Sequence, residues 1–149
     1  MARIERSIDI DAPPEKVFGE LAHWGRLTQW STITADHDGP ERCTGVGEEF
    51  DQHLRLAGIN VQTHWRVTEY EPPRMLAYEA TGPGDSWLRM RQEVVAVDAG
   101  SRVQLQVDYE LPAGVLGEAV DRMYVERRNQ REAEHSLENL KELIEAGAG

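Results

Sequence analysis

Cysteine is almost absent from this sequence, and positive charge is scarce. The lone Cys43 excludes an internal disulfide and a metal cluster built from cysteines. Lysine and arginine number 16 against 27 acidic residues, which gives a formal net charge of -11. Because nucleic-acid binding depends on lysine and arginine, no nucleic-acid partner is expected. The same charge disfavours docking on an anionic membrane surface.

Long hydrophobic runs are missing as well. No segment approaches the roughly 20 apolar residues that a membrane-spanning helix needs, so stable membrane insertion is not expected. The opening residues MARIER lack the apolar core of a secretion signal, which favours a cytoplasmic protein. With 149 residues, 40% of them hydrophobic, the chain is predicted to form a single domain over residues 1–149.

The first third of the chain predicts one strand and two short helices. Residues 3–10 alternate between apolar and polar side chains, as a half-buried strand does. A helix is expected to begin at the acidic capping candidate Asp11 with the prolines that follow it, and to end near Ala22. A second short helix should carry Leu27 and Trp30.

The next segment indicates less regular structure. Residues 31–36 favour a short strand, and residues 36–47, rich in glycine, proline and charge, predict a loop.

A hairpin is the strongest local prediction. Residues 50–56 and 59–67 alternate, and the dipeptide Ala57-Gly58 between them fits a two-residue turn. The apolar pattern sets a register with Phe50 opposite Trp65. The other predicted pairs are Gln52 with Thr63, Glu49 with Arg66, and Asp51 with His64. Opposite charges facing each other support this register, because cross-strand pairs stabilise a sheet.

Three more strands are expected to extend the sheet. After a turn at residues 71–74, residues 76–80 should return beside residues 65–67, with Glu79 facing Arg66. Two further strands are predicted over residues 86–97 and 102–111. Pairing Val97 with Arg102 would place Arg91 opposite Asp108 and Arg89 opposite Glu110.

The C-terminal segment predicts one long helix, because no proline follows Pro112. Its apolar stripe comprises Leu116, Ala119, Val120, Met123, Ala133, Leu137, Leu140 and Ile144. Such a helix can bury its stripe only against the apolar face of the sheet. The predicted fold class is therefore α+β: a curved antiparallel sheet of about six to seven strands, wrapped around a long C-terminal helix, with two short helices after the first strand.

Several local motifs resemble the START-like superfamily, also called SRPBCC, and within it the polyketide cyclase/dehydrase and lipid-transport families. They are IDIDAPPEKVF at residues 8–18, Trp24, Trp30, GVGEEF at residues 45–50, residues 67–73, and SLENLK at residues 136–141. The resemblance implies the helix-grip fold and a pocket for a small hydrophobic or polyketide-like molecule. Members include cyclases, dehydratases, hormone receptors and lipid carriers, so the fold alone does not transfer an activity.

Polar residues interrupt the predicted inward faces. Gln52, Thr63 and Gln92 interrupt the sheet face, and Glu126 and Gln130 interrupt the helix stripe. A buried polar group without a partner costs about 1–3 kcal/mol, so we expect a hollow between sheet and helix instead of a dry core. The structural alternative is that these groups form hydrogen bonds with one another and that the helix carboxylates are solvated.

Two sets of site residues follow from the hollow. The catalytic candidates are Glu126, Gln130 and Glu134, because a carboxylate in a semi-apolar pocket can have its pKa raised toward neutrality. The predicted ligand-binding residues are Gln52, Thr63, Trp65, Tyr78, Met90, Gln92, Tyr109, Met123 and Arg127. None of the five histidines falls on a predicted inward face, so neither a metal site nor a cofactor is expected.

Three functions fit this sequence. The hollow could belong to a cyclase- or dehydratase-like enzyme that holds a flexible keto substrate, or to a non-catalytic carrier or sensor of a lipid or other hydrophobic ligand. A protein-interaction module would need an exposed apolar patch, for which Trp87 is the one hint. The chain is expected to be a monomer or a homodimer.

Overall fold

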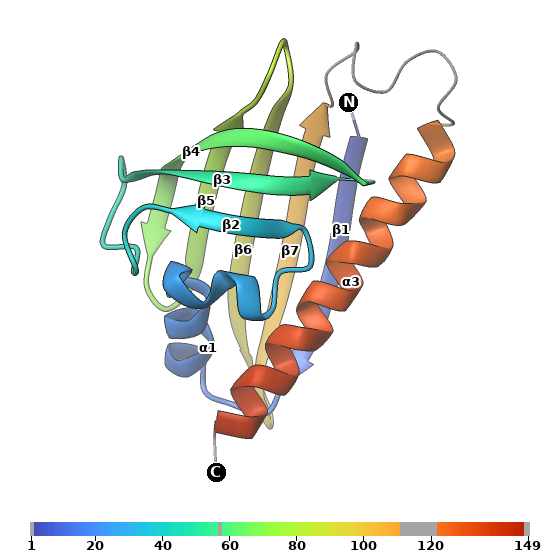
Figure 1. Cartoon of the computed structure of the whole chain (residues 1–149). Coiled ribbons are helices and arrows are strands. Elements are labelled where there is room, and N and C mark those ends of the chain that lie inside the picture. The colour runs from blue at the N-terminus through green and yellow to red at the C-terminus, as the bar shows by residue number, and fades with distance from the viewer. Residues whose placement is uncertain (1, 57, 111–121, 148–149) are drawn as a thin grey trace.

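The structure is a computed structural model, which describes residues 2–56, 58–110 and 122–147. Seven strands, two α-helices and one 3-10 helix follow one another along these residues (Figure 1). They are β1 (Ala2–Ile10), α1 (Pro14–Leu21), the 3-10 helix η1 (Trp24–Gln29), β2 (Thr34–Asp38), β3 (Glu49–Leu56), β4 (Ile59–Glu71), β5 (Met75–Thr81), β6 (Trp87–Val97), β7 (Gly100–Glu110) and α3 (Arg122–Gly147).

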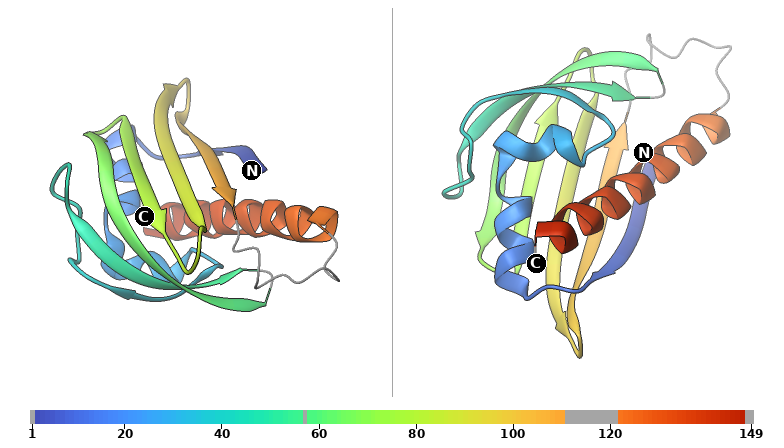
Figure 2. Two further views of the ribbon diagram at one scale, coloured as in Figure 1. Left: turned by 90° about the horizontal axis from the view of Figure 1, so that it is seen from above. Right: turned by 60° about the horizontal axis from the view of Figure 1, so that its bottom comes forward.

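The seven strands form one antiparallel sheet in the order β1-β7-β6-β5-β4-β3-β2. Figures 1 and 2 show the sheet curling around α3, which runs across its concave side and contacts β1. The short helices α1 and η1 lie beside the C-terminal half of α3 and connect β1 to β2. This arrangement confirms the predicted helix-grip fold.

The β3–β4 hairpin has the predicted register. Phe50 pairs with Trp65, and Gln52 pairs with Thr63. On the convex face, His64 lies 2.7 Å from the Asp51 carboxylate and 2.9 Å from the Glu49 carboxylate. The next pair, β4 with β5, also forms as expected: Arg66 pairs with Glu79, Val67 with Tyr78, and Trp65 with Ala80.

The predicted register of β6 and β7 is wrong by two residues. Val97 pairs with Gly100 instead of Arg102, so Arg89 faces Asp108 and Arg91 faces Gln106. The shift keeps every side chain on its predicted face because the side-chain period of a strand is two. Its cause is a turn shorter than expected. Glycine is required there because a Cβ at residue 100 would lie 2.3 Å from the carbonyl oxygen of Ile10.

The N-terminal elements also differ in detail from the prediction. Pro13, not Asp11, caps α1, and the side chain of the capping residue makes no hydrogen bond to the helix. The backbone N–H of Asp11 instead donates to Glu145 of α3 over 3.0 Å. The second short helix is of 3-10 type and ends before Trp30. Strand β2 runs to Asp38, into the segment predicted as a loop.

Helix α3 buries a face slightly different from the predicted stripe. Leu137, Leu140 and Ile144 are buried as expected, whereas 59% of Met123 is exposed. The buried positions toward the helix start are Val125 and Asn129. The predicted stripe members Leu116, Ala119 and Val120 lie outside the described residues.

Candidate functional site

A cavity of about 100 Å³ lies between the concave face of the sheet and α3. Side chains that point inward from alternate positions of the strands form most of its wall, because successive residues of a strand face opposite sides. Its aliphatic members include Leu54, Leu88, Met90, Leu105, Val107 and, from α3, Leu137. The sheet and the helix thus meet without filling the space between them.

Aromatic rings form one side of the cavity. Phe50 and Trp65 are stacked at an interplanar angle of 4°, with centroids 5.9 Å apart. Tyr78 stands at 89° to both of these rings. Trp24 of η1 closes the group, with its ring centroid 4.3 Å from that of Phe50. Register positions these rings, since Phe50, Trp65 and Tyr78 occupy inward positions of three adjacent strands.

The hydroxyl of Tyr78 is buried within this aromatic group. It accepts a hydrogen bond of 3.0 Å from the indole N–H of Trp24. Burial raises the pKa of Tyr78, so the phenol stays protonated at neutral pH. Its own proton remains a donor on the cavity wall.

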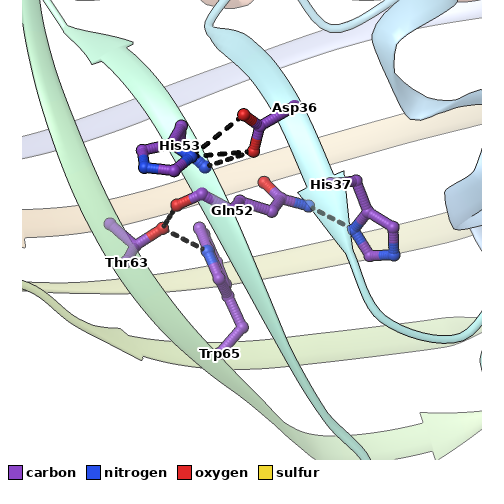
Figure 3. Close-up of polar contacts among 6 residues, drawn as sticks. All are labelled: Asp36, His37, Gln52, His53, Thr63 and Trp65. Atoms are coloured by element: carbon purple, nitrogen blue, oxygen red, sulfur yellow. Dashed lines mark hydrogen bonds and ion pairs between the residues drawn. The ribbon is translucent and has the colours of Figure 1, made fainter.

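A chain of polar contacts continues from the aromatic wall to β2 (Figure 3). The indole N–H of Trp65 donates to the Thr63 hydroxyl over 2.8 Å, and that hydroxyl donates to the backbone carbonyl of Gln52 over 2.9 Å. The side-chain amide of Gln52 lies 3.2 Å from Nδ1 of His37. The opposite ring nitrogen of His37 lies 3.0 Å from the carbonyl oxygen of Pro40. Gln52 lines the cavity, whereas Thr63 does not.

Asn129 is a wall residue that the sequence reasoning missed. Its Nδ2 donates to the Tyr109 hydroxyl over 3.0 Å, which joins α3 to β7. Burial raises the pKa of Tyr109. The signal for Asn129 was present, because it lies one helical turn before Ala133 and two before Leu137 on the same face.

Three polar side-chain atoms of residues that line the cavity are buried without a hydrogen-bond partner among the described residues. They are Nε1 of Trp30, Oε1 of Gln92 and Oδ1 of Asn129. Each of these residues is no more than 6% exposed. Such atoms are rare in folded proteins, because an unsatisfied buried group costs about 1–3 kcal/mol.

The structure brings six of the sequence-predicted site residues together. The cavity wall includes Gln52, Trp65, Tyr78, Met90, Gln92 and Tyr109. Thr63 is not on the wall, but its hydroxyl donates to the backbone carbonyl of Gln52 and accepts from the indole of Trp65. Their role in ligand binding stays a prediction.

The candidates on the helix lie elsewhere. Gln130 and Glu134 bind the Arg6 guanidinium at 3.1 Å and 2.8 Å, and Glu126, like those two, is not on the cavity wall. Arg127 and Met123 are exposed. These five side chains are thus not among the residues that line the cavity, and a role for them in catalysis or ligand binding stays a prediction. Arg6, which shares a face of β1 with Ile4 and Ile8, contacts Gln130 and Glu134 of α3 at this flank.

Ionisable groups are few around the cavity. Of the described residues on its wall, Glu132, which is half-buried, is the one acidic side chain, and no lysine or arginine is among them. Tyr78 and Tyr109 stay neutral because their pKa values are raised. No group of three or more histidine, cysteine, aspartate or glutamate residues in the described part of the chain is placed to hold a metal ion. The arrangement suits an uncharged, largely apolar molecule.

The curled sheet, the long helix across it and the cavity between them define a helix-grip protein of the START type. A family model described as polyketide cyclase / dehydrase and lipid transport matches residues 1–145, and the chain belongs to that family. This result confirms the resemblance inferred from the sequence motifs. Among the described residues, no helix combines the length and apolar character that crossing a membrane requires.

Curated relatives come from Mycobacterium tuberculosis. The uncharacterized protein Rv1546 is 27% identical over 150 residues, covering 96% of this chain and 99% of the relative. A protein named toxin Rv0910 is 25% identical over 144 residues, covering 94% of this chain and 96% of the relative.

Solved structures share the fold. The ZhuI aromatase/cyclase from Streptomyces sp. R1128 superimposes with a TM-score of 0.78 at 18% identity, covering 99% of this chain and 96% of that one. A START superfamily protein from Mycobacterium smegmatis gives a TM-score of 0.76 at 12% identity, with 97% of each chain covered.

Proposed function

We propose that this protein reversibly binds a small, largely apolar and uncharged molecule in the cavity between the sheet and α3, as a carrier or a sensor. The observation that carries the proposal is the cavity itself, a partly enclosed space of about 100 Å³ with an aliphatic and aromatic wall. Membership of a family whose description includes lipid transport agrees with it.

The hydrophobic effect supplies the affinity in this proposal. Each CH₂ group moved from water into an apolar site contributes about 0.8 kcal/mol, so a ligand that fills the cavity gains several kcal/mol. The wall is largely pre-formed, because Phe50, Trp65 and Tyr78 pack against one another without a ligand. Little ordering is therefore needed on binding.

Carriage is favoured over acid–base catalysis by the chemistry of the wall. A general base must lie within hydrogen-bond reach of the proton that it removes and titrate near the working pH. Of the two carboxylates that the sequence suggested, Glu134 is instead paired with Arg6 at 2.8 Å and Glu126 is not on the cavity wall. This leaves Glu132 as the one carboxylate among the described wall residues. The raised pKa values of Tyr78 and Tyr109 make both phenols poor bases.

A second candidate function is a cyclase-type reaction, favoured by one contact. The Tyr109 hydroxyl accepts a hydrogen bond from Asn129 and keeps its own proton, which it can donate to a ligand carbonyl. Holding reacting atoms together supplies a large share of the rate in such reactions. Mass spectrometry distinguishes the two functions, since a carrier releases an offered keto-containing ligand unaltered and a cyclase converts it.

Equilibrium dialysis of naphthalene tests the proposed binding. The wild-type protein should retain the probe, and Met90→Trp, which places an indole in the cavity, should lower its affinity at least about tenfold. Val95→Trp is the matched control, because Val95 lies on the same strand but is 41% exposed. Equal retention of naphthalene by the wild type and Met90→Trp would overturn the assignment of the site.

A further inference from the structure

Resting on the proposed function, we propose that the cavity selects neutral molecules that carry a hydroxyl or N–H group. In this proposal, the side-chain oxygens of Gln92 and Asn129 accept that group's hydrogen, and anionic ligands such as carboxylates are rejected. The proposal concerns which apolar molecules bind, and it follows from the polar atoms of the wall.

The first support is the pair of unpartnered amide oxygens. Gln92 is 5% exposed and Asn129 is 6% exposed, and both line the cavity. Neither Oε1 of Gln92 nor Oδ1 of Asn129 has a partner among the described residues. A carboxamide oxygen only accepts hydrogen bonds, so the ligand group that completes either residue must be a donor.

The second support is the orientation of the two amides. Nδ2 of Asn129 donates to the Tyr109 hydroxyl at 3.0 Å, and this contact leaves Oδ1 as the end without a partner. Nε2 of Gln92 lies 3.6 Å from the sulfur of Met90, which is a weak acceptor. Both contacts engage the amino end of the amide and leave the oxygen without a partner among the described residues.

The third support is the charge around the cavity. Of the described residues that line it, Glu132 is the one acidic side chain, and none is a lysine or an arginine. A carboxylate ligand would enter without a cation to pair with, and an unpaired buried charge is strongly unfavourable. The faces of the surrounding aromatic rings carry negative charge density, which adds to this rejection.

Trp30 adds a hydrogen-bond donor, whereas the two amide oxygens are acceptors. Its indole N–H is buried without a partner among the described residues and needs an acceptor. A ligand that also carries a carbonyl or ether oxygen would satisfy it. The ligand class that fits the whole wall is thus a neutral, largely apolar molecule with a hydroxyl donor and an oxygen acceptor.

Three probes with the same ring system test this selectivity by equilibrium dialysis at neutral pH. They are 2-naphthol, which carries a neutral hydroxyl, naphthalene, which has no polar group, and 2-naphthoate, which is anionic. We expect 2-naphthol to bind at least about tenfold more tightly than either of the others, because it alone supplies a donor to an unsatisfied acceptor without bringing a charge.

Variants assign the selectivity to the two amides. Gln92→Met and Asn129→Leu, made separately and together, remove the acceptors and keep side chains of similar length. The double variant should bind 2-naphthol and naphthalene within about twofold of each other, with naphthalene affinity retained or raised. Gln62→Met, on the exposed face of β4, should keep the wild-type preference.

The outcomes separate this inference from the proposed function. If the wild type binds naphthalene as tightly as 2-naphthol, or binds 2-naphthoate best, the selectivity proposal fails while the apolar site stands. A double variant that keeps the full preference for 2-naphthol would show that Gln92 and Asn129 do not cause the selectivity. If the wild type retains none of the three probes, the proposed function itself is overturned.

Discussion

Replacing Gln92 by methionine should make the ligand-free protein more stable. Gln92 is 5% exposed, and its Oε1 has no partner among the described residues. Its Nε2 lies 3.6 Å from the sulfur of Met90. Methionine has nearly the same length and no polar atom that needs a hydrogen bond. The substitution therefore removes the penalty of the unsatisfied oxygen and gives up one weak contact.

The expected gain is about 1–3 kcal/mol in the free energy of unfolding. For a chain of 149 residues, each kcal/mol raises Tm by about 2–4 °C, so the expected shift is about 2–12 °C. Urea denaturation followed by tryptophan fluorescence measures the change, and Trp24, Trp30 and Trp65 lie on the cavity wall as reporters. Gln62→Met, on an exposed face, should stay within about 0.5 kcal/mol of the wild type.

A destabilised Gln92→Met variant would refute this reasoning. A loss greater than about 0.5 kcal/mol relative to Gln62→Met would mean that Gln92 has good partners in the folded protein. The unpartnered oxygen would then be no evidence for a ligand group. The expected combination, higher stability with weaker binding of 2-naphthol, is the pattern of a residue kept for function.

Three further predictions concern other parts of the fold. Burial raises the pKa of the Cys43 thiol to about 11. Ellman's reagent should therefore react slowly with Cys43 in the native protein at pH 7.5 and rapidly in denaturant. A fast reaction with the native protein would contradict the burial of the thiol. Hydrogen bonds to Glu49 and Asp51 raise the pKa of His64 above 6.5, so its contribution to stability is present below about pH 6.5 and fades as the pH rises through the folded-state pKa. Because His64 and its two carboxylate partners are exposed, the wild type should be more stable than His64→Gln by less than about 1 kcal/mol at pH 6. Paired urea titrations should show this difference shrinking by pH 8, and a difference that grows with pH would argue against these contacts. Leu140, with no exposed surface, should lose about 2–5 kcal/mol of unfolding free energy on replacement by alanine, whereas a loss under 1 kcal/mol would contradict its place between α3 and the sheet.

The hairpin was predictable from the sequence because two independent patterns agree. The apolar alternation and the charge pairs indicate the same β3–β4 register, and Phe50 does face Trp65. The β6–β7 register had charge pairs as well, but they did not determine the length of its turn, because a shift of two residues brings Arg89 opposite Asp108 instead of Arg91. The chain turns so tightly before Gly100 that a Cβ there would meet the Ile10 carbonyl oxygen, and this contact between distant segments is invisible in the local sequence.

The helix side of the site was harder to predict for a physical reason. A helical stripe defines a face only to within a residue or so, and Asn129 and Gln130 fit the period about equally well. The choice between them depends on β1, where Arg6 holds Gln130 and Glu134 at the flank and leaves Asn129 on the cavity wall. The sheet side was more accurate, because strand parity leaves no such ambiguity.

A crystal structure of the protein with 2-naphthol tests the central claim most directly. We predict the naphthalene ring between the sheet and α3, beside Trp65, with its hydroxyl within 3.2 Å, a normal hydrogen-bond distance, of the side-chain oxygen of Gln92 or Asn129. Density for the probe only on the outer surface, with the cavity closed by its own side chains, would contradict the account.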